Sequence, residues 1–101
     1  MVSDFLTITG NLSTSKGTVS YNDLTLTTAL KIESSTNISF TTSAASTLTL
    51  VFNADCNKNI NVDGNSYSIS NGVLTMELAS GAHTITKADA INLYYMSVVN
   101  K

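Results

Sequence analysis

Lysine is the residue type in this sequence whose placement most directly suggests a chemistry. The 101 residues include no arginine, and the cations are Lys16, Lys31, Lys58, Lys87 and Lys101. Lys31 lies on the polar face of "LTLTTALKI", where apolar and polar side chains alternate as on a half-buried strand. A lysine is a compact charge on a flexible stem, so lysines set apart on a surface suit a ligand with separated carboxylates.

Each lysine also has a simpler interpretation, as a solvated residue that keeps the protein soluble. Lys31 has a specific alternative partner in Glu33, two residues further along the same strand face. Lys58, in "NKNINV", and Lys101, at the end of the sequence, fit the simpler interpretation better than the other three lysines. The lysines alone therefore do not decide between a binding site and a polar surface.

Carboxylates are scattered along the chain rather than paired, as general acid–base catalysis would require. Asp63 is explained by the turn "DGN", and Asp55 and Asp89 border loops, where an aspartate bonds to nearby backbone. The full set is Asp4, Asp23, Glu33, Asp55, Asp63, Glu77 and Asp89. We predict from this distribution that the chain is not an enzyme and needs no cofactor. A structural calcium held by loop oxygens stays open as an alternative, although no EF-hand spacing is present.

Cys56 and His83 are each the only residue of their kind. A nucleophilic thiol would need the imidazole beside it, but neither "NADCNKN" nor "SGAHTIT" resembles a catalytic signature. A lone cysteine also rules out an internal disulfide and zinc sites built on several thiolates. We expect Cys56 to pack in the fold rather than to react.

Composition limits the kinds of partner that the protein could bind. Charged residues make up 12% of the sequence and the net charge is −2, against a typical charged share of about 25%. Phosphate binding needs a basic stripe, so we expect no nucleic acid, and no apolar run approaches the roughly 20 residues that span a membrane. The start "MVSDFLTITG" lacks signal-peptide features, so we expect a piece cut from a longer secreted chain.

Apolar residues recur with period two through nearly the whole sequence, which predicts strands and no helix. The expected strands are 5–9, 18–21, 23–32, 37–42, 47–53, 59–63, 66–70, 73–79, 82–87 and 92–99. Short turns separate them, and Asn71 and Gly72 give the clearest hairpin signal, since both residues tolerate the positive φ of a type I′ turn. Many short strands with tight turns predict an all-β fold, an antiparallel β-sandwich of jelly-roll type.

Tyrosines are candidates for sugar binding, because aromatic faces stack on sugar rings. Tryptophan is absent, so tyrosines would have to supply such a surface. Alternation puts Tyr94 and Tyr95 on opposite faces of one strand, so at least one of them is a core residue and they form no paired platform. Tyr21 and Tyr67 stay open as stacking candidates, with packing in the core as the alternative for each.

The order of short segments resembles the family 77 carbohydrate-binding modules, which occur beside pectate lyase catalytic domains of polysaccharide lyase families 1 and 9. The resemblance rests on "GNLSTSKGTVSYNDLTLTTALKIESSTNISF", "TLTLVF", "INVDG" and "GVLTMELASGAHTITKADAINLYYMSV", and it covers nearly the whole chain. It implies one carbohydrate-binding module over residues 1–101, a β-sandwich that binds homogalacturonan of low methyl esterification through lysines.

The family's recognition lysines correspond to three positions here. The resemblance implies Lys16 in "STSKGTV", Lys31 in "TALKIES" and Lys87 in "TITKADA" as ligand-binding residues. Asp23, in "YNDLTL", departs from the family pattern, because a small or neutral turn residue is expected there. An acid close to the anion site would weaken binding.

The function that the resemblance implies is that of a non-catalytic pectin-binding module in a secreted, extracellular bacterial protein. Its partners would be an acidic polysaccharide and a pectate lyase catalytic domain in the same parent chain, with the module a monomer. Two alternatives stay open: a structural or protein-interaction sandwich with incidental lysines, and a module for neutral β-glucan or xylan that relies on tyrosines.

Overall fold

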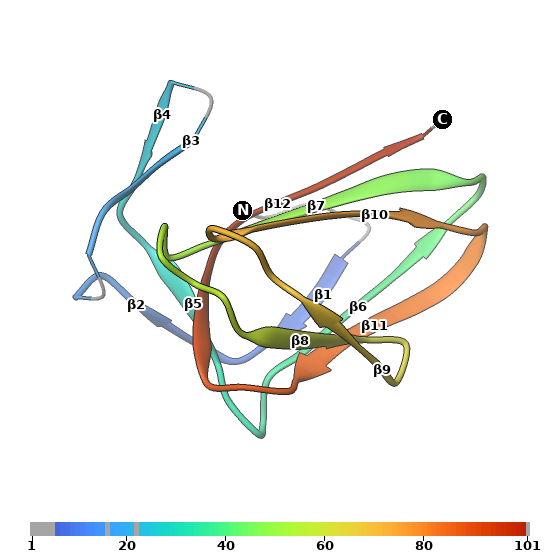
Figure 1. The fold of residues 1–101 in the computed structure, drawn as a ribbon. Helices are drawn as coiled ribbons and strands as arrows, with labels where there is room; N and C mark the ends of the chain where they lie inside the picture. The colour runs from blue at the N-terminus through green and yellow to red at the C-terminus, as the bar shows by residue number, and fades with distance from the viewer. Residues whose placement is uncertain (1–5, 16, 22, 101) are drawn as a thin grey trace.

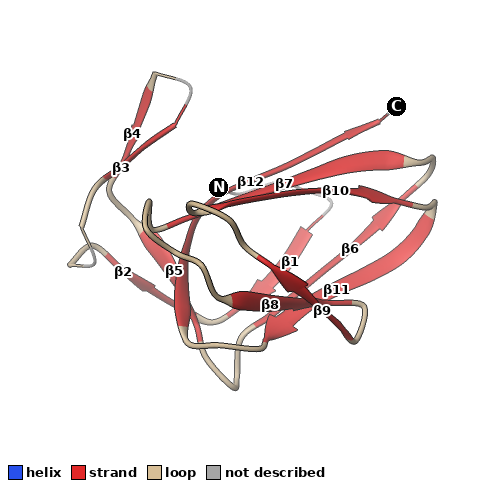
Figure 2. Ribbon diagram, viewed as in Figure 1, coloured by secondary structure: helices blue, strands red, loops and turns tan. Residues whose placement is uncertain are grey.

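The computed structural model describes residues 6–15, 17–21 and 23–100, and within these ranges every regular element is a strand (Figures 1 and 2). The strands are β1 (Leu6–Thr9), β2 (Asn11–Ser13), β3 (Val19–Tyr21), β4 (Leu24–Leu26), β5 (Ala29–Ile32), β6 (Asn37–Thr42), β7 (Ser46–Phe52), β8 (Asn59–Val62), β9 (Asn65–Ser68), β10 (Val73–Leu78), β11 (Gly81–Lys87) and β12 (Ile91–Asn100). No helix long and apolar enough to cross a lipid bilayer occurs in the described ranges.

The strands form two five-stranded antiparallel sheets and a separate hairpin. Sheet A has the order β1-β6-β11-β8-β9, sheet B the order β10-β7-β12-β5-β2, and β3 pairs with β4. From β5 onward the chain passes from one sheet to the other at each connection, except at the β8–β9 hairpin. This alternation is the connectivity of a jelly roll. The predicted fold class, an antiparallel β-sandwich, is confirmed.

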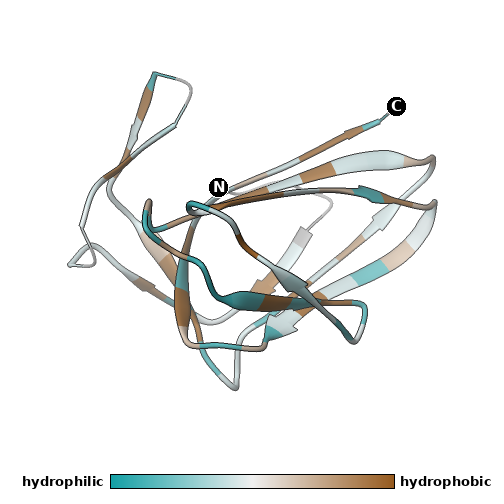
Figure 3. Cartoon of the chain, viewed as in Figure 1, coloured by the Kyte–Doolittle hydropathy of each residue, from teal (hydrophilic) through white to brown (hydrophobic). Residues whose placement is uncertain are grey.

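The main core lies between the two sheets and follows from the period-two pattern. On β7, Leu48, Leu50 and Phe52 are fully buried, and they meet Ile38 and Ile85 from sheet A. Figure 3 shows the hydrophobic and hydrophilic residues alternating along the strands. Because successive side chains point to opposite faces, each sheet contributes one apolar face to this core.

A second, smaller apolar cluster lies on the outer face of sheet B. Val51 stands between the core residues Leu50 and Phe52, so its side chain points outward, yet it is only 2% exposed. The hairpin β3–β4, which projects from the sandwich in Figure 1, supplies Val19 and packs with Val51 and Tyr94. The hairpin therefore covers part of a sheet face that would otherwise be open to water.

The prediction of one continuous strand over residues 23–32 is wrong. Two strands occupy this range, β4 and β5, because β4 leaves the sandwich to pair with β3. Alternation correctly buries Leu30 and Ile32, whereas Leu24 on the projecting hairpin is 45% exposed. The three-residue strand β2 was not predicted, since "NLS" is too short to show a period.

The chain ends in a strand with a local irregularity. The pairing of β12 with β7 shifts register between Leu93 and Tyr95, as at a β-bulge. Tyr94 and Tyr95 consequently both contact the smaller cluster rather than opposite faces of the sheet. Tyr94 is 3% exposed, which confirms that one of the two tyrosines is a core residue.

Among the residues that the structure describes, two turns carry positive φ at both central residues, as type I′ turns require. Asp63 and Gly64 join β8 to β9 in a regular hairpin. Asn71 and Gly72 have the predicted conformation, but they close only an isolated bridge, because β9 and β10 belong to different sheets. The prediction of a turn at Asn71 and Gly72 is therefore correct, whereas the prediction that it joins two paired strands in a hairpin is wrong.

Candidate functional site

Lys31 points away from the core on the outer face of sheet B. Its neighbours Leu30 and Ile32 are each 1% exposed, and alternation turns the lysine to the other side. Strand β5 lies between β2 and β12, where Asn11 and Asn92 are directly opposite Lys31. The sheet therefore places an amide on each side of this ammonium group.

These side chains form a polar row across β5, in which hydrogen bonds and one ion pair join two groups, one on each side of the strand. Glu33 lies 3.6 Å from the Lys31 ammonium, and both side chains are 37% exposed. The Asn11 amide donates to Oε1 of Glu33 at 3.0 Å. On the other side, the Asn92 amide donates to Oδ1 of Asn53 at 3.0 Å. The local ion pair that the sequence offered as an alternative for Lys31 is present, and it lies within a wider polar row.

The row continues to the segment before β3. The Asn53 amide donates to the Tyr94 hydroxyl at 3.3 Å, and that hydroxyl donates to the Gly17 carbonyl at 3.0 Å. Gly17 is thereby fixed to the outer face of sheet B. The predicted site residue Lys16 precedes it and lies outside the described residues.

Thr36 holds the turn that follows Lys31. Its hydroxyl donates to the Lys31 carbonyl at 2.7 Å and accepts the Glu33 amide at 2.9 Å. The side chain is only 3% exposed. The backbone under the ion pair is thus braced by a buried threonine, so a ligand would meet a preformed surface.

Lys87 belongs to sheet A but lies at the same end of the sandwich as Lys31. It is the last residue of β11 and is exposed, and residues 88–90 then lead to β12. The first residue of β12, Ile91, pairs with Ile32 next to Lys31. The structure therefore brings two predicted site residues, Lys31 and Lys87, to one end of the molecule, on different sheets.

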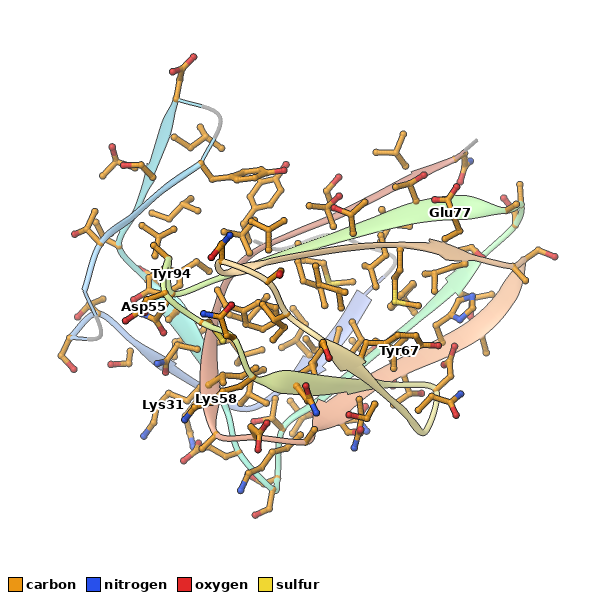
Figure 4. All side chains as sticks on the ribbon, in the orientation of Figure 1. Lys31, Asp55, Lys58, Tyr67, Glu77 and Tyr94 are labelled. Atoms are coloured by element: carbon orange, nitrogen blue, oxygen red, sulfur yellow. The ribbon has the colours of Figure 1, made fainter. Side chains whose placement is uncertain are left out.

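Lys58 lies at this end as well, although the sequence favoured a simple surface role for it. It directly precedes β8, whose first residue Asn59 donates its amide to Oδ2 of Asp89 at 2.9 Å. Figure 4 shows Lys58 on the same side as Lys31 in this view, with Tyr67 and Glu77 across the molecule. Hereafter the lysine end means residues 31–36, 53–59, 69–72 and 87–92.

Charge is distributed unevenly over the described ranges. Each described lysine belongs to the lysine end, together with the acids Glu33, Asp55 and Asp89. The remaining described acids, Asp23, Asp63 and Glu77, lie elsewhere. Within these ranges the carboxylate ion pairs are Lys31–Glu33 and His83–Asp63. Lys58 and Lys87 therefore have no ion-pair partner in the described part of the chain.

The tyrosine candidates are both partly buried. The Tyr21 ring packs on Tyr95, with 5.4 Å between ring centroids and 41° between planes. Tyr67, on β9, packs against the main core. The two rings belong to different apolar clusters, so they do not form one stacking surface.

Asp23 lies in the turn between β3 and β4, with φ of 64°.

Cys56 is 8% exposed and belongs to the main core, so the prediction that it packs is confirmed. No group of three or more His, Cys, Asp and Glu side chains that could hold a metal ion occurs among the residues that the structure describes.

The opposite end of the sandwich, called here the far end, comprises residues 43–45, 63–64 and 79–83. It contains a histidine whose two ring nitrogens both have hydrogen-bond partners in the same chain. His83 is 8% exposed, with Nδ1 2.7 Å from Oδ2 of Asp63 and Nε2 2.7 Å from the Ala79 carbonyl. Carboxylate and carbonyl oxygens only accept hydrogen bonds, so this geometry favours the imidazolium form of His83, in which both ring nitrogens donate.

The pKa values at the far end agree with this geometry. Burial disfavours the charged ring, but the bonds to Asp63 and Ala79 outweigh it and raise the pKa of His83 above 6.5. Burial likewise opposes ionisation of Asp63, yet the bonds from His83 and the Thr84 amide lower its pKa below 3.8. This cluster is satisfied internally.

Sequence reasoning missed the asparagines of the polar row, Asn11, Asn53 and Asn92. A signal for two of them existed, because asparagine is depleted in strands and both Asn11 and Asn92 are strand residues. Asn53 follows β7, and only the tertiary structure brings it to Asn92.

The jelly-roll sandwich is an architecture of many lectin domains, and a row of amides beside an exposed ammonium supplies donors and acceptors for sugar hydroxyls. Fold and site together are those expected of a glycan-binding β-sandwich. The chain belongs to the family described as Carbohydrate binding module 77, whose model matches residues 1–96. The family resemblance found in the sequence is therefore confirmed, and carbohydrate-binding modules are in general non-catalytic.

A solved structure gives a second, independent comparison. It comes from a study of how the complexity of the Ruminococcus flavefaciens cellulosome reflects an expansion in glycan recognition. The two chains are 57% identical with a TM-score of 0.92, and the match covers 98% of this chain and 84% of that one. No curated protein sequence matches the chain.

Proposed function

We propose that this carbohydrate-binding module binds pectin, namely homogalacturonan of low methyl esterification. The observation that carries the proposal is the lysine end, where Lys31 stands partly exposed between two amides and Lys87 lies at the end of the other sheet. The ligand carries about one carboxylate per sugar, so cations set apart along a surface meet successive carboxylates. Lys16 is the third proposed contact.

Electrostatics sets the strength and the selectivity of this binding. An exposed ion pair contributes about 0 to 1 kcal/mol, so three lysines alone give weak binding. Hydrogen bonds from the amides of Asn11 and Asn92 supply the remainder. We expect a dissociation constant of about 1 μM or weaker, near −8 kcal/mol. Methyl esterification removes the charge that the lysines recognise, and salt screens it.

The biological role that follows is attachment. A polysaccharide partner follows from the family. We propose that the module, as a monomer without catalytic activity, holds an appended pectate lyase on plant cell wall outside the bacterial cell. Nucleic acid and membrane have no place in this role, since the net charge is −2 and no basic stripe is present in the sequence.

Affinity electrophoresis tests the proposal. The purified protein runs in gels containing polygalacturonate, highly methylated pectin, soluble β-glucan or no polymer. Retardation by polygalacturonate alone is the expected result. Free migration in every gel would leave the structural or protein-interaction sandwich as the better account, and retardation by β-glucan would favour neutral-glycan binding through Tyr21 and Tyr67.

A further inference from the structure

We propose that Lys58 is an additional ligand-binding residue, which pairs with a carboxylate of a galacturonan chain lying across the lysine end. This inference rests on the proposed function and extends it, because the family resemblance implies no role for Lys58. Three observations carry it: the position of the Lys58 backbone, the state of its ammonium group and the bracing of its loop.

The backbone of Lys58 is fixed beside the connection between Lys87 and β12. Its carbonyl accepts the Ile69 amide at 2.8 Å. The next residue, Asn59, is bonded to Asp89 twice: its amide donates to the carboxylate at 2.9 Å, and its carbonyl accepts the Asp89 amide at 3.2 Å. Lys58 therefore stands next to the segment that links Lys87 to the strand paired with Lys31.

The ammonium group of Lys58 is available to a ligand. The residue is exposed and forms no ion pair within the described ranges. Two acids lie near it, Asp55 three residues earlier in the same exposed loop and Asp89, which accepts the Asn59 amide through Oδ2, and neither forms an ion pair with Lys58 within the described ranges. Lys31, by contrast, already has Glu33 at 3.6 Å. Lys58 thus has less internal competition for an incoming carboxylate than Lys31 has.

The loop that carries Lys58 is braced against a turn. The Cys56 carbonyl accepts the Gly72 amide at 2.9 Å, and the Phe52 amide donates to the Gly72 carbonyl at 2.7 Å. Asn57 adds a contact, because its Oδ1 accepts the Asn71 amide at 3.2 Å. Binding through Lys58 therefore requires ordering of its side chain but not of the loop.

The test compares Lys58→Ala with the wild-type protein in calorimetric titrations with a long oligogalacturonate at low salt. We expect the dissociation constant to rise about two- to five-fold, the range of one exposed ion pair, and the difference to shrink as salt is added. Ala45→Glu is the matched control. It also lowers the net charge by one, but it lies in the exposed turn between β6 and β7, at the far end.

The outcomes separate this inference from the proposed function. If wild type binds and Lys31→Ala weakens binding while Lys58→Ala binds like wild type, the inference about Lys58 is wrong and the proposed function stands. An equal loss in Lys58→Ala and Ala45→Glu would also overturn it, because net charge alone would then explain the effect. If the wild type does not bind oligogalacturonate, the proposed function itself fails.

Discussion

The two ends of the sandwich treat positive charge in opposite ways. At the far end the His83 ring is buried, and both of its nitrogens are bonded at 2.7 Å to acceptors of the same chain. At the lysine end Lys58 and Lys87 are exposed without an ion pair in the described ranges, and Lys31 shares one partially exposed pair. The first arrangement uses charge to hold strands together, whereas the second leaves charge open to solvent.

The difference follows from the number of donors and the depth of each group. An imidazolium has two donors, and Asp63 and Ala79 use both. An ammonium has three donors and needs no dry pocket, so one contact to Glu33 leaves donors of Lys31 for a ligand. Changes of the His83–Asp63 pair should therefore alter stability, and changes of the lysines should alter binding.

The turn at Gly72 should show the largest effect. Gly72 has φ of +81°, and a Cβ added there would clash with the Asn53 carbonyl oxygen. We expect Gly72→Ala to lower the free energy of unfolding by about 2 to 4 kcal/mol, as measured by urea titration. Gly64→Ala at the far end is the matched control. It has the same φ with nothing within 4 Å of the added Cβ, so its cost should be about 1 kcal/mol. Equal losses of unfolding free energy in the two variants would show that the Asn53 carbonyl does not restrict residue 72.

His83→Ala should come next. It removes a buried, doubly bonded ring, so we expect a loss of about 1 to 3 kcal/mol in the free energy of unfolding with unchanged ligand affinity. Weaker polygalacturonate binding in a folded His83→Ala protein would show that the two ends are not separate in function.

The same pair predicts a pH dependence. Because the pKa of His83 is raised, its contribution is complete below 6.5 and is lost as pH rises through the raised value. Because the pKa of Asp63 is lowered, its contribution is present above 3.8 and is lost as pH falls through the lowered value. The urea midpoint should therefore decrease as the pH is raised from below 6.5 through the raised pKa of His83, and it should decrease less in His83→Ala.

Lys31→Ala should reduce affinity without reducing stability. We expect the dissociation constant for polygalacturonate to rise about five-fold, near 1 kcal/mol, and the free energy of unfolding to stay within about 0.5 kcal/mol. Calorimetry and urea titration of the same preparation measure both. A stability loss with unchanged affinity would mean that the Lys31–Glu33 pair is structural.

Glu33→Gln should give the smallest effect, and in the opposite direction. The glutamate competes with a ligand carboxylate for Lys31, so its neutralisation should tighten binding by about two-fold. Glu77→Gln is the control with the same change in net charge, since Glu77 lies on β10 and accepts a bond from Thr47 at 2.8 Å. Weaker binding in Glu33→Gln would show that Glu33 positions Lys31 rather than competing with it.

Local features of the fold were predictable from the sequence. Alternation predicted the all-β class and the burial of Leu30 and Ile32, "DGN" predicted a turn at Asp63, and Asn71–Gly72 predicted a turn with positive φ. The break between β4 and β5 was not predictable, because Thr25 and Thr27 continue the alternation through it. Only the pairing of β4 with β3 makes the chain leave the sheet there.

The candidate site shows the same boundary between local and distant effects. The outward direction of Lys31 and its pair with Glu33 follow from strand period alone. The position of Lys58 does not, because it depends on the bonds between Asn59 and Asp89, 30 residues apart. Sequence patterns report neighbours along a strand, whereas a site made by several loops depends on which strands pair.

The most direct test of charge recognition uses one pectin before and after removal of its esters. A highly methyl-esterified sample is titrated into the wild-type protein by calorimetry, then saponified and titrated again at the same chain length. We predict that binding appears only after saponification and weakens with added salt. Equal binding to both samples would contradict it, because the lysines would then not be reading carboxylates.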